Sequence, residues 1–488
     1  MKKYTRHTSR ALAAAACFAG SLIAVERASA DPLGSIFYIE LENHNWTQPS
    51  GEASLTLSGA NTGVASGSGF SALYQNPAAP YLNSLINQQW SSGSQSYSYV
   101  AGSSPVITAN NGGITAGVSY ASAYHSVLST PTGSPVSIHP SEPNYVWQEA
   151  GSNYGVLNDN DPYAASSGSV GVIKTNNGGQ APQHLTGLLQ SAGIPWKSYQ
   201  EDIDLTTSSG SVNQPSSGSL SSAVAPQNQW TVPLKSFSGS SASYVNPYNH
   251  SNQYDFATKH DGSLFFEDTN GSSGSANFSP SNPQASHWAP LQQLSLDLAS
   301  NNVAKYNLIT PNQFNDMHTA LSTAFTYNGF TWKSGSDGNR IAVGDNFLSQ
   351  VVPLIEASTA FQNNGAIVIW TDETEGSNRD TFTHTLAEIV ISASAKGIQI
   401  SDGVYNSTLD YTHSSDLATL QDIYGVSANT ATGYLADAAN GSQDGTHDLS
   451  DMFVSNTMPT SVPEPTIAGT LLAGAGMLGL LRRRSGTA

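Results

Sequence analysis

Residues 366–373 read Ala-Ile-Val-Ile-Trp-Thr-Asp-Glu, an apolar run that ends in two adjacent carboxylates, Asp372 and Glu373. Two other runs have the same design. SIFYIEL at Ser35–Leu41 is followed by Glu42-Asn43, and YNLIT at Tyr306–Thr310 precedes Asp316 and His318. Short apolar runs bounded by turn-forming residues predict buried strands. Because ligands bind beyond the carboxyl ends of strands in open α/β sheets, we expect these polar side chains to converge at one edge.

The segments around these runs predict an α/β fold with a mainly parallel sheet sandwiched between helices. A further strand is predicted at Leu386–Ser392. Helices are predicted over Pro80–Gln88, Leu185–Ala192, Leu291–Asn301 and Asp345–Asn363. Asp345 is placed to cap the last of these helices, and Pro353 predicts a kink in it. Ser/Gly-rich insertions such as Gly51–Gly69 and Ser208–Ser222 are expected to be loops of one domain that spans residues 31–455.

The charge balance argues against nucleic acid as a partner. The 488-residue chain has a formal net charge of −18, and eight of its 17 Lys and Arg residues lie in the two termini. An acidic surface repels a phosphate backbone, so no nucleic-acid-binding surface is expected. A site that handles phosphate in this chain would need a metal ion to counter the negative field.

Met1–Ala30 has the pattern of a secretory signal peptide. Basic residues at its start precede the apolar stretch Ala11–Val25 and the small residues Ala28-Ser29-Ala30. The pattern predicts export to the periplasm, the cell surface or the extracellular matrix. Cys17, the only cysteine, lies within this leader, so no disulfide is expected in the mature chain.

Residues 456–488 contain a second targeting segment. Val462-Pro463-Glu464-Pro465 precedes the apolar run Thr466–Leu481, which ends at Arg482-Arg483-Arg484. This order resembles the PEP-CTERM sorting signal. The resemblance implies a Gram-negative bacterium, processing by an exosortase near the Pro-Glu-Pro box and a transient inner-membrane anchor. A plain membrane anchor is the alternative interpretation.

The segment SIHPSEPNY at Ser137–Tyr145 contains a candidate nucleophile, Ser141. A turn from strand to helix would place Ser141 at a helix N-terminus, where free backbone N–H groups favour anions such as a phosphoryl group. Asn144 is placed to aim its amide at a phosphate oxygen, and a base or a metal would activate the serine. Taken alone, a Ser-Glu-Pro turn of this kind is more often a helix cap than a nucleophile.

Six segments occur in an order that resembles the bacterial phosphoesterase family of phospholipases C and acid phosphatases, in the alkaline phosphatase superfamily. The resemblance covers about residues 35–425 and implies an alkaline phosphatase-like fold. The segments are Glu42-Asn43-His44, His139–Tyr145, Trp196–Glu201, Lys259-His260, Pro311–His318 and Thr371-Asp372-Glu373.

The resemblance implies a metal-dependent hydrolase of phosphate mono- or diesters that forms a phosphoseryl intermediate on Ser141. Glu42, Asn43, Asp372 and Glu373 would bind one divalent metal, which Ser141 also contacts. Asp316, His318 and His384 would either bind a second metal or contact the phosphate and the leaving group. His260 would contact the phosphate or support the metal site.

The residue types leave the metal identity open. The four ligands of the first site present oxygen only, which suits manganese, magnesium or calcium, whereas two imidazoles at a second site would favour zinc. One or two divalent ions are therefore expected. His44 and His139 are interpreted as structural residues.

A non-catalytic protein that binds exopolysaccharide or another surface is the alternative function. It rests on the sorting signal, the Ser/Gly-rich loops and the many tyrosines. It predicts glycan binding without turnover of any phosphate ester.

Overall fold

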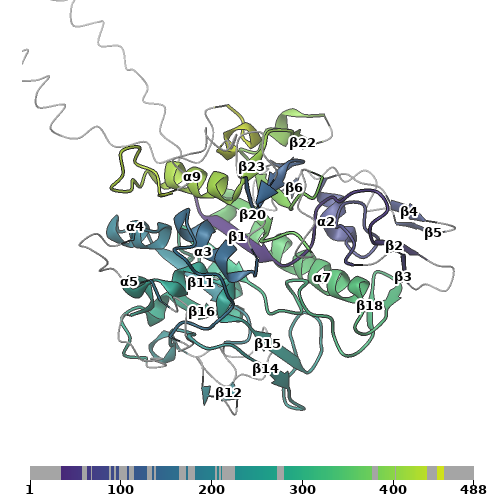
Figure 1. Ribbon diagram of the computed structural model, residues 1–488, viewed down its shortest axis with the longest axis horizontal. Helices are drawn as coiled ribbons and strands as arrows, with labels where there is room; N and C mark the ends of the chain where they lie inside the picture. Colours follow the sequence, from purple (N-terminus) through teal and green to yellow (C-terminus); the bar gives the residue numbers. More distant parts are fainter. Residues whose placement is uncertain are drawn as a thin grey trace, which may run out of the picture. The chain divides into compact units, whose positions relative to one another are not determined.

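The three apolar runs form neighbouring strands at the centre of one large sheet in a computed structural model of the chain (Figure 1). The structure describes residues 34–455 with internal gaps, and both terminal targeting segments lie outside the described residues. The gaps are residues 58–62, 67–68, 87–89, 93–94, 98–106, 109–114, 129–134, 137–138, 164–171, 174–181, 204–205, 208–209, 212–225, 272–279, 376–382, 402 and 437–447.

The sheet has nine strands and is mostly parallel, which confirms the predicted α/β class. Its strand order is β16-β11-β17-β1-β20-β21-β7-β22, with β6 also paired to β7. The first five strands run parallel, β21 is antiparallel to both β20 and β7, and β22 is parallel to β7. The bounds are β1 Ile36–Leu41, β6 Ile107–Thr108, β7 Thr115–Ala121, β11 Trp196–Gln200, β16 Trp288–Pro290, β17 Tyr306–Thr310, β20 Ala366–Thr371, β21 Glu388–Ser392 and β22 Val404–Ser407.

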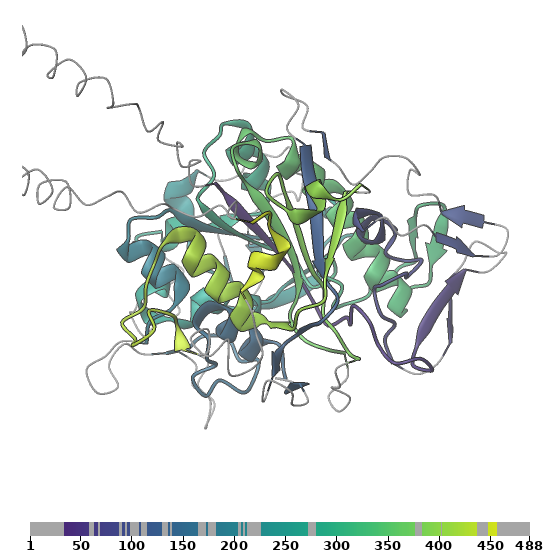
Figure 2. The ribbon, with the colours of Figure 1, turned by 90° about the horizontal axis from the view of Figure 1, so that it is seen from above.

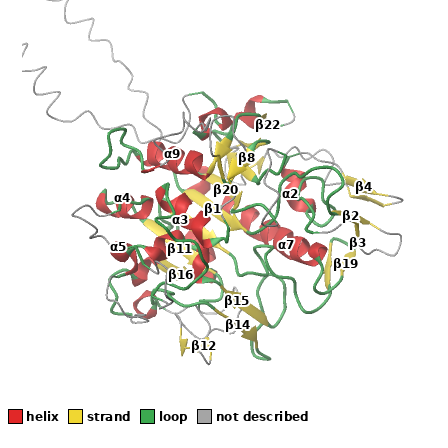
Figure 3. Ribbon diagram, in the orientation of Figure 1, coloured by secondary structure: helices red, strands yellow, loops and turns green. Residues whose placement is uncertain are grey.

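Alternation along the central strands divides the core into two layers. Ile36 and Tyr38 of β1 pack on one face of the sheet, and Phe37, Ile39 and Leu41 pack on the other. Figures 2 and 3 show helices on both sides of the strands. The first face is covered mainly by α3 (Glu142–Ala150), α4 (Leu185–Ser191) and α9 (His413–Tyr424), and the second by α2 (Pro80–Leu85), α6 (Gln292–Ala299), α7 (Asp337–Glu356) and α8 (Thr359–Gln362). A short helix, α5, spans Glu267–Asn270.

Several small two-stranded sheets lie outside the central sheet. The segment predicted as a loop at Gly51–Gly69 contains one of them, since Leu55 is buried and anchors its first strand. Ser208–Ser222 lies largely outside the described residues. The pairs are β2 Ser54–Leu57 with β3 Gly63–Ser66, β4 Trp90–Ser92 with β5 Gln95–Tyr97, β8 Tyr124–His125 with β23 Tyr411–Thr412, β9 Val127–Leu128 with β10 Pro135–Val136, β12 Thr206–Thr207 with β13 Gly210–Ser211, β14 Phe237–Ser240 with β15 Gln253–Phe256, and β18 Phe325–Tyr327 with β19 Phe330–Trp332.

Four helices lie where the sequence predicts them, but the long one has different ends. α7 begins eight residues earlier than predicted, because the Ser336 side chain accepts a hydrogen bond from the Asn339 N–H and caps it. The predicted cap, Asp345, is inside α7 and accepts hydrogen bonds from the N–H groups of Tyr81 and Leu82 at 2.7 and 2.8 Å. Asp345 therefore satisfies the start of α2 and joins two helices.

No helix in the part of the chain that the structure describes is long and apolar enough to cross a bilayer. The apolar run Thr466–Leu481 lies beyond that part.

Candidate functional site

The polar residues after β1, β17 and β20 meet at one edge of the sheet, as the parallel order requires. Leu41 of β1 is in register with Thr371 of β20, so Glu42 and Asp372 leave adjacent strands at the same level. The Asn43 N–H donates to Asp372 Oδ1 at 3.1 Å. The Glu42 N–H donates to the carbonyl of Asp316 at 2.7 Å, which ties the β17 loop to the end of β1.

Two residues at this edge have left-handed backbone conformations, which residues other than glycine rarely adopt. Asn43 has φ 49°, and Met317, between Asp316 and His318, has φ 84°. Strained backbone of this kind is kept where the surroundings enforce it, and it clusters at functional sites. The fully buried Met317 side chain packs against Gly344 of α7, where a Cβ would come within 2.3 Å of Met317 Cγ. Packing against α7 therefore holds the turn that presents Asp316 and His318.

Ser141 lies where β1, β20 and α3 meet. It precedes α3, yet its side chain does not cap that helix. Its hydroxyl lies 3.0 Å from Glu42 Oε2 and 3.2 Å from Glu373 Oε1, and it can donate to either. The hydroxyl is therefore held by carboxylates from two separate strand ends, which argues against the interpretation of Ser141 as a helix cap.

The expectation of free N–H groups at the start of α3 is wrong. The Glu142 N–H donates to Asp159 Oδ1 at 3.1 Å, Pro143 has no N–H, and the Asn144 N–H donates to the Ser141 carbonyl at 2.9 Å. The Asn144 amide donates to Glu373 Oε2 at 3.2 Å. In this structure Asn144 therefore contacts a predicted metal ligand, and an anion at this end of α3 would have to be held by side chains.

His260 bridges two of the acidic residues. Its Nε2 lies 3.0 Å from Glu42 Oε1, and its Nδ1 lies 3.3 Å from Asp316 Oδ2. The imidazole stacks on the Tyr145 ring with centroids 5.1 Å apart. Burial, helped by the positive charge of Lys259, lowers the pKa of His260 well below its usual value. His260 thus supports the acidic residues as a neutral group.

Three contributors were not identified from the sequence. The Tyr145 hydroxyl donates to Glu42 Oε1 at 2.6 Å. His139, interpreted as structural, lies with Nδ1 2.7 Å from Glu373 Oε2. Lys259 lies near enough for its charge to lower the pKa of Glu42, although its ammonium pairs with Asp159 at 2.9 Å. All three belong to segments that carry the family resemblance, which was the available signal.

The predicted set Asp316, His318 and His384 is not brought together. Asp316 Oδ1 accepts from the His318 N–H at 2.7 Å, and His318 Nδ1 lies 3.0 Å from Thr319 Oγ1. Burial lowers the pKa of His318 to about 3. His384 Nε2 instead lies 3.2 Å from the carboxylate of Glu52. His384 therefore contacts another loop, and the three residues do not form a second ligand set here.

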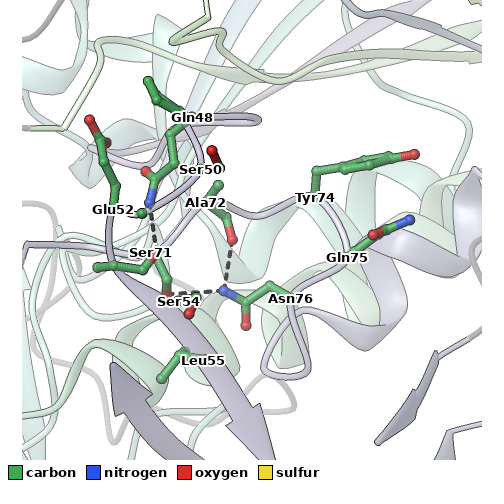
Figure 4. Close-up of a pocket in the computed structure, with 13 residues that line it drawn as sticks. Gln48, Ser50, Glu52, Ser54, Leu55, Ser71, Ala72, Tyr74, Gln75 and Asn76 are labelled. Carbon is green, nitrogen blue, oxygen red and sulfur yellow. Dashed lines mark hydrogen bonds between the residues drawn. The ribbon is translucent and has the colours of Figure 1, made fainter. Parts of the chain in front are cut away.

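The His384 partner, Glu52, lines a cavity of about 420 Å³ beside the loop that follows β1 (Figure 4). Gln48 and Asn76 line it as well, and the amide of each donates a hydrogen bond to a nearby backbone carbonyl. Gln48 donates to the Ala53 carbonyl at 2.7 Å and Asn76 to the Ala72 carbonyl at 2.7 Å. These bonds brace the wall of the cavity.

A scan of protein-family models and a search of curated proteins gave no match to this chain.

The site contains several buried carboxyl groups. Glu42, Asp316, Asp372 and Glu373 are all at most 5% exposed. Burial and then the charge of Asp372 raise the pKa of Glu42 well above its usual value. Burial and then the charge of Glu373 raise the pKa of Asp372 to about 7. Like charges confined in this way favour uptake of protons or of a cation.

The donor atoms fit a cation in part. Asn43 Oδ1 and Asp372 Oδ2 are buried and have no hydrogen-bond donor among the described residues. Acceptor oxygens of this kind suit a hard divalent ion. No three or more His, Cys, Asp and Glu side chains of the described part are already arranged to hold a metal ion. The Asn43 amide oxygen and the Ser141 hydroxyl are further oxygen donors beside these carboxylates.

Above about pH 6.5, where histidines with a lowered pKa such as His318 are neutral in both states, the raised carboxyl pKa values predict that the metal-free protein loses stability up to about pH 8. Burial raises the pKa of Asp416 from 3.8 to about 7 and that of Glu201 from 4.5 to about 8, and Asp372 behaves like Asp416. The folded state binds these protons more tightly than the unfolded state, so their stabilisation is complete at low pH and is lost as pH rises through the folded values. Thermal melts in EDTA should show a lower midpoint at pH 8 than at pH 6.5, and a midpoint that rises over this range would contradict the assignment.

Proposed function

We propose that the chain is an exported, metal-dependent phosphoric ester hydrolase with an alkaline phosphatase-like fold and a serine nucleophile. The observation that carries the proposal is the position of the Ser141 hydroxyl, 3.0 Å from Glu42 and 3.2 Å from Glu373. A buried serine beside carboxylates from two strand ends suits activation by a metal or a base, with no need for a Ser-His-Asp triad.

We infer one divalent ion, held by Glu42, Asn43, Asp372 and Glu373 together with Ser141. The unused oxygens of Asn43 and Asp372 and the mutual repulsion of the carboxylates support it. When bound there, such an ion lowers the pKa of a coordinated hydroxyl and offsets charge on phosphate oxygens. His384 is left out of this set because it contacts Glu52.

The side chains of the site can carry two chemical steps. In the first, Ser141 Oγ attacks phosphorus and passes its proton to Glu373 or Glu42, while the bond from phosphorus to the leaving oxygen breaks. In the second, water attacks phosphorus and the P–Oγ bond breaks; Ser141 Oγ takes back a proton from the carboxyl that received it, and that carboxylate accepts one proton from the water, which leaves as phosphate. His139 and Asn144, which contact Glu373, would hold that carboxylate toward the serine.

His260 and Asp316 have the chemistry to assist the departing group. His260 and Asp316 contact each other, and burial raises the pKa of Asp316 well above its usual value. A carboxyl with a raised pKa holds its proton to higher pH, which suits it to protonate a leaving oxygen. Asp316, His260 and His318 are therefore proposed to contact the phosphate and its leaving group, and not a second metal.

We infer from the sequence of the terminal segments that this activity lies outside the inner membrane. The proposed route is export by Met1–Ala30, a transient anchor at residues 466–481 and exosortase processing near Pro463-Glu464-Pro465, all of which lie outside the described residues. The proposed partners are a phosphate ester substrate and the exosortase, with no nucleic acid.

Hydrolysis by the purified protein tests the proposal directly. We expect turnover of p-nitrophenyl phosphate or bis-p-nitrophenyl phosphate that disappears after EDTA treatment and returns with Mn²⁺, Zn²⁺, Mg²⁺ or Ca²⁺. Metal analysis of the same sample should give one ion per chain. Undiminished turnover in EDTA, or glycan binding without turnover of any ester, would contradict it, and the latter would favour the surface-binding alternative.

A further inference from the structure

A buried histidine forms a hydrogen bond with the backbone carbonyl of Asp372. His413, the first residue of α9, is fully buried, and its Nε2 lies 2.7 Å from the Asp372 carbonyl. A carbonyl can only accept, so Nε2 must carry the proton. The pairing of β8 with β23 brings α9 to this place, far along the chain from β20.

Other buried groups orient the second nitrogen of His413. Its Nδ1 lies 2.9 Å from the Tyr124 hydroxyl and 3.3 Å from Trp370 Nε1. Burial lowers the pKa of His413 to about 3, so the ring is neutral and Nδ1 accepts. The Tyr124 hydroxyl is also within hydrogen-bond distance of Asp416, and its single proton can go to only one of these two partners. Asp416 in turn shares a hydrogen bond with Glu388. This polar chain leaves the ring one orientation.

The residue on the neighbouring strand end has a matching arrangement with the opposite nitrogen. His44 Nδ1 lies 3.1 Å from the Glu42 carbonyl, and its Nε2 lies 3.0 Å from Asp337 at the start of α7. Asp337 is itself held by the N–H of Ser71 at 2.9 Å. His44 is fully buried, as is His413. Each of the two acidic strand ends therefore has its backbone carbonyl bonded to a buried histidine whose second nitrogen contacts another side chain.

We propose that His413 and His44 are positioning residues that fix Asp372 and Glu42 at the distance the site requires. The proposal rests on the proposed function, because it names what keeps these two carboxylates in place for a cation and for Ser141. Neither ring touches the Ser141 hydroxyl, so both would act through the main chain. Groups of this kind around a metal site typically contribute 10- to 100-fold in affinity or activity.

The opposite use of the two nitrogens gives a matched test. Glutamine places its amide N–H near the Nε2 position and asparagine places it near Nδ1. His413→Gln therefore keeps the donor to Asp372 and His413→Asn removes it, whereas His44→Asn keeps the donor to Glu42 and His44→Gln removes it. We expect the two variants that lose the donor to show kcat/KM for bis-p-nitrophenyl phosphate and Mn²⁺ affinity reduced about 10- to 100-fold, and the two that keep it to stay near the wild type.

A second readout separates this inference from the proposed function. The Asn43 N–H donates to Asp372, so its hydrogen exchange reports the position of that carboxylate without any turnover. We expect faster exchange at Asn43 in His413→Asn than in His413→Gln. That result would uphold the positioning role even if the wild type hydrolysed no ester. Equal exchange and equal activity within each pair would overturn it, whether both variants kept wild-type behaviour or lost it together with thermal stability.

Discussion

Ser141→Ala is expected to lower kcat for p-nitrophenyl phosphate or its bis ester at least about 10³-fold, because removal of a nucleophile eliminates the covalent route. Stability should change little. The serine does not cap α3, and its hydroxyl only adds a donor among carboxylates that repel each other. Steady-state kinetics and thermal melts on the same preparation measure both effects.

Ser358→Ala is the matched control. Ser358 is also a buried serine that precedes a helix, but its hydroxyl accepts from the Phe361 N–H and caps α8. Loss of such a cap costs about 1 kcal/mol. The control should therefore lose stability and keep its activity. The reverse pattern, with an active Ser141→Ala, would exclude Ser141 as the nucleophile.

Asp372→Asn is expected to have opposite effects on activity and on metal-free stability. Activity should fall at least about 100-fold, since an amide is a poor substitute for a carboxylate that binds a divalent ion. In EDTA at pH 8 the variant should be more stable than the wild type. The pKa of Asp372 is raised to about 7, so its charge opposes folding above that pH, and the amide removes the charge. Kinetics and melts with and without Mn²⁺ separate the two effects.

Asp345→Asn provides the comparison for this variant. Burial raises the pKa of Asp345 to about 7 as well, but its carboxylate caps α2 through the N–H groups of Tyr81 and Leu82. Its replacement should preserve activity. If Asp345→Asn and Asp372→Asn lowered activity equally, the loss would reflect general damage to the fold, and the role given to Asp372 would be wrong.

The central strands could be predicted from the sequence because each is a short, local run of apolar residues. β17 has the predicted bounds, β1 begins one residue later than the predicted Ser35–Leu41, and β20 extends one residue beyond its apolar core, Ala366–Trp370. Their parallel order then brings Glu42, Asp316 and Asp372 to one edge of the sheet. The antiparallel β21 does not follow from periodicity, since a fully buried strand reads the same in either direction.

Side-chain partners across long sequence distances could not be predicted. His384 has suitable chemistry for a ligand, but a loop brings Glu52 to it. Asp345 resembles a cap of its own helix, yet tertiary packing gives it the start of α2. The sequence predicts only a structural role for His44; its Nδ1 contacts the Glu42 carbonyl two residues before it, and its Nε2 contacts Asp337, 293 residues away.

Trapping the covalent intermediate tests the central claim most directly. A phosphate ester is mixed with the metal-loaded protein, the reaction is quenched in acid during the first turnover, and peptides are sequenced by mass spectrometry. The account predicts one added phosphoryl group, on Ser141, that is absent when EDTA is present from the start. A phosphoryl group on another residue, or turnover with none on Ser141 at any quench time, would contradict it.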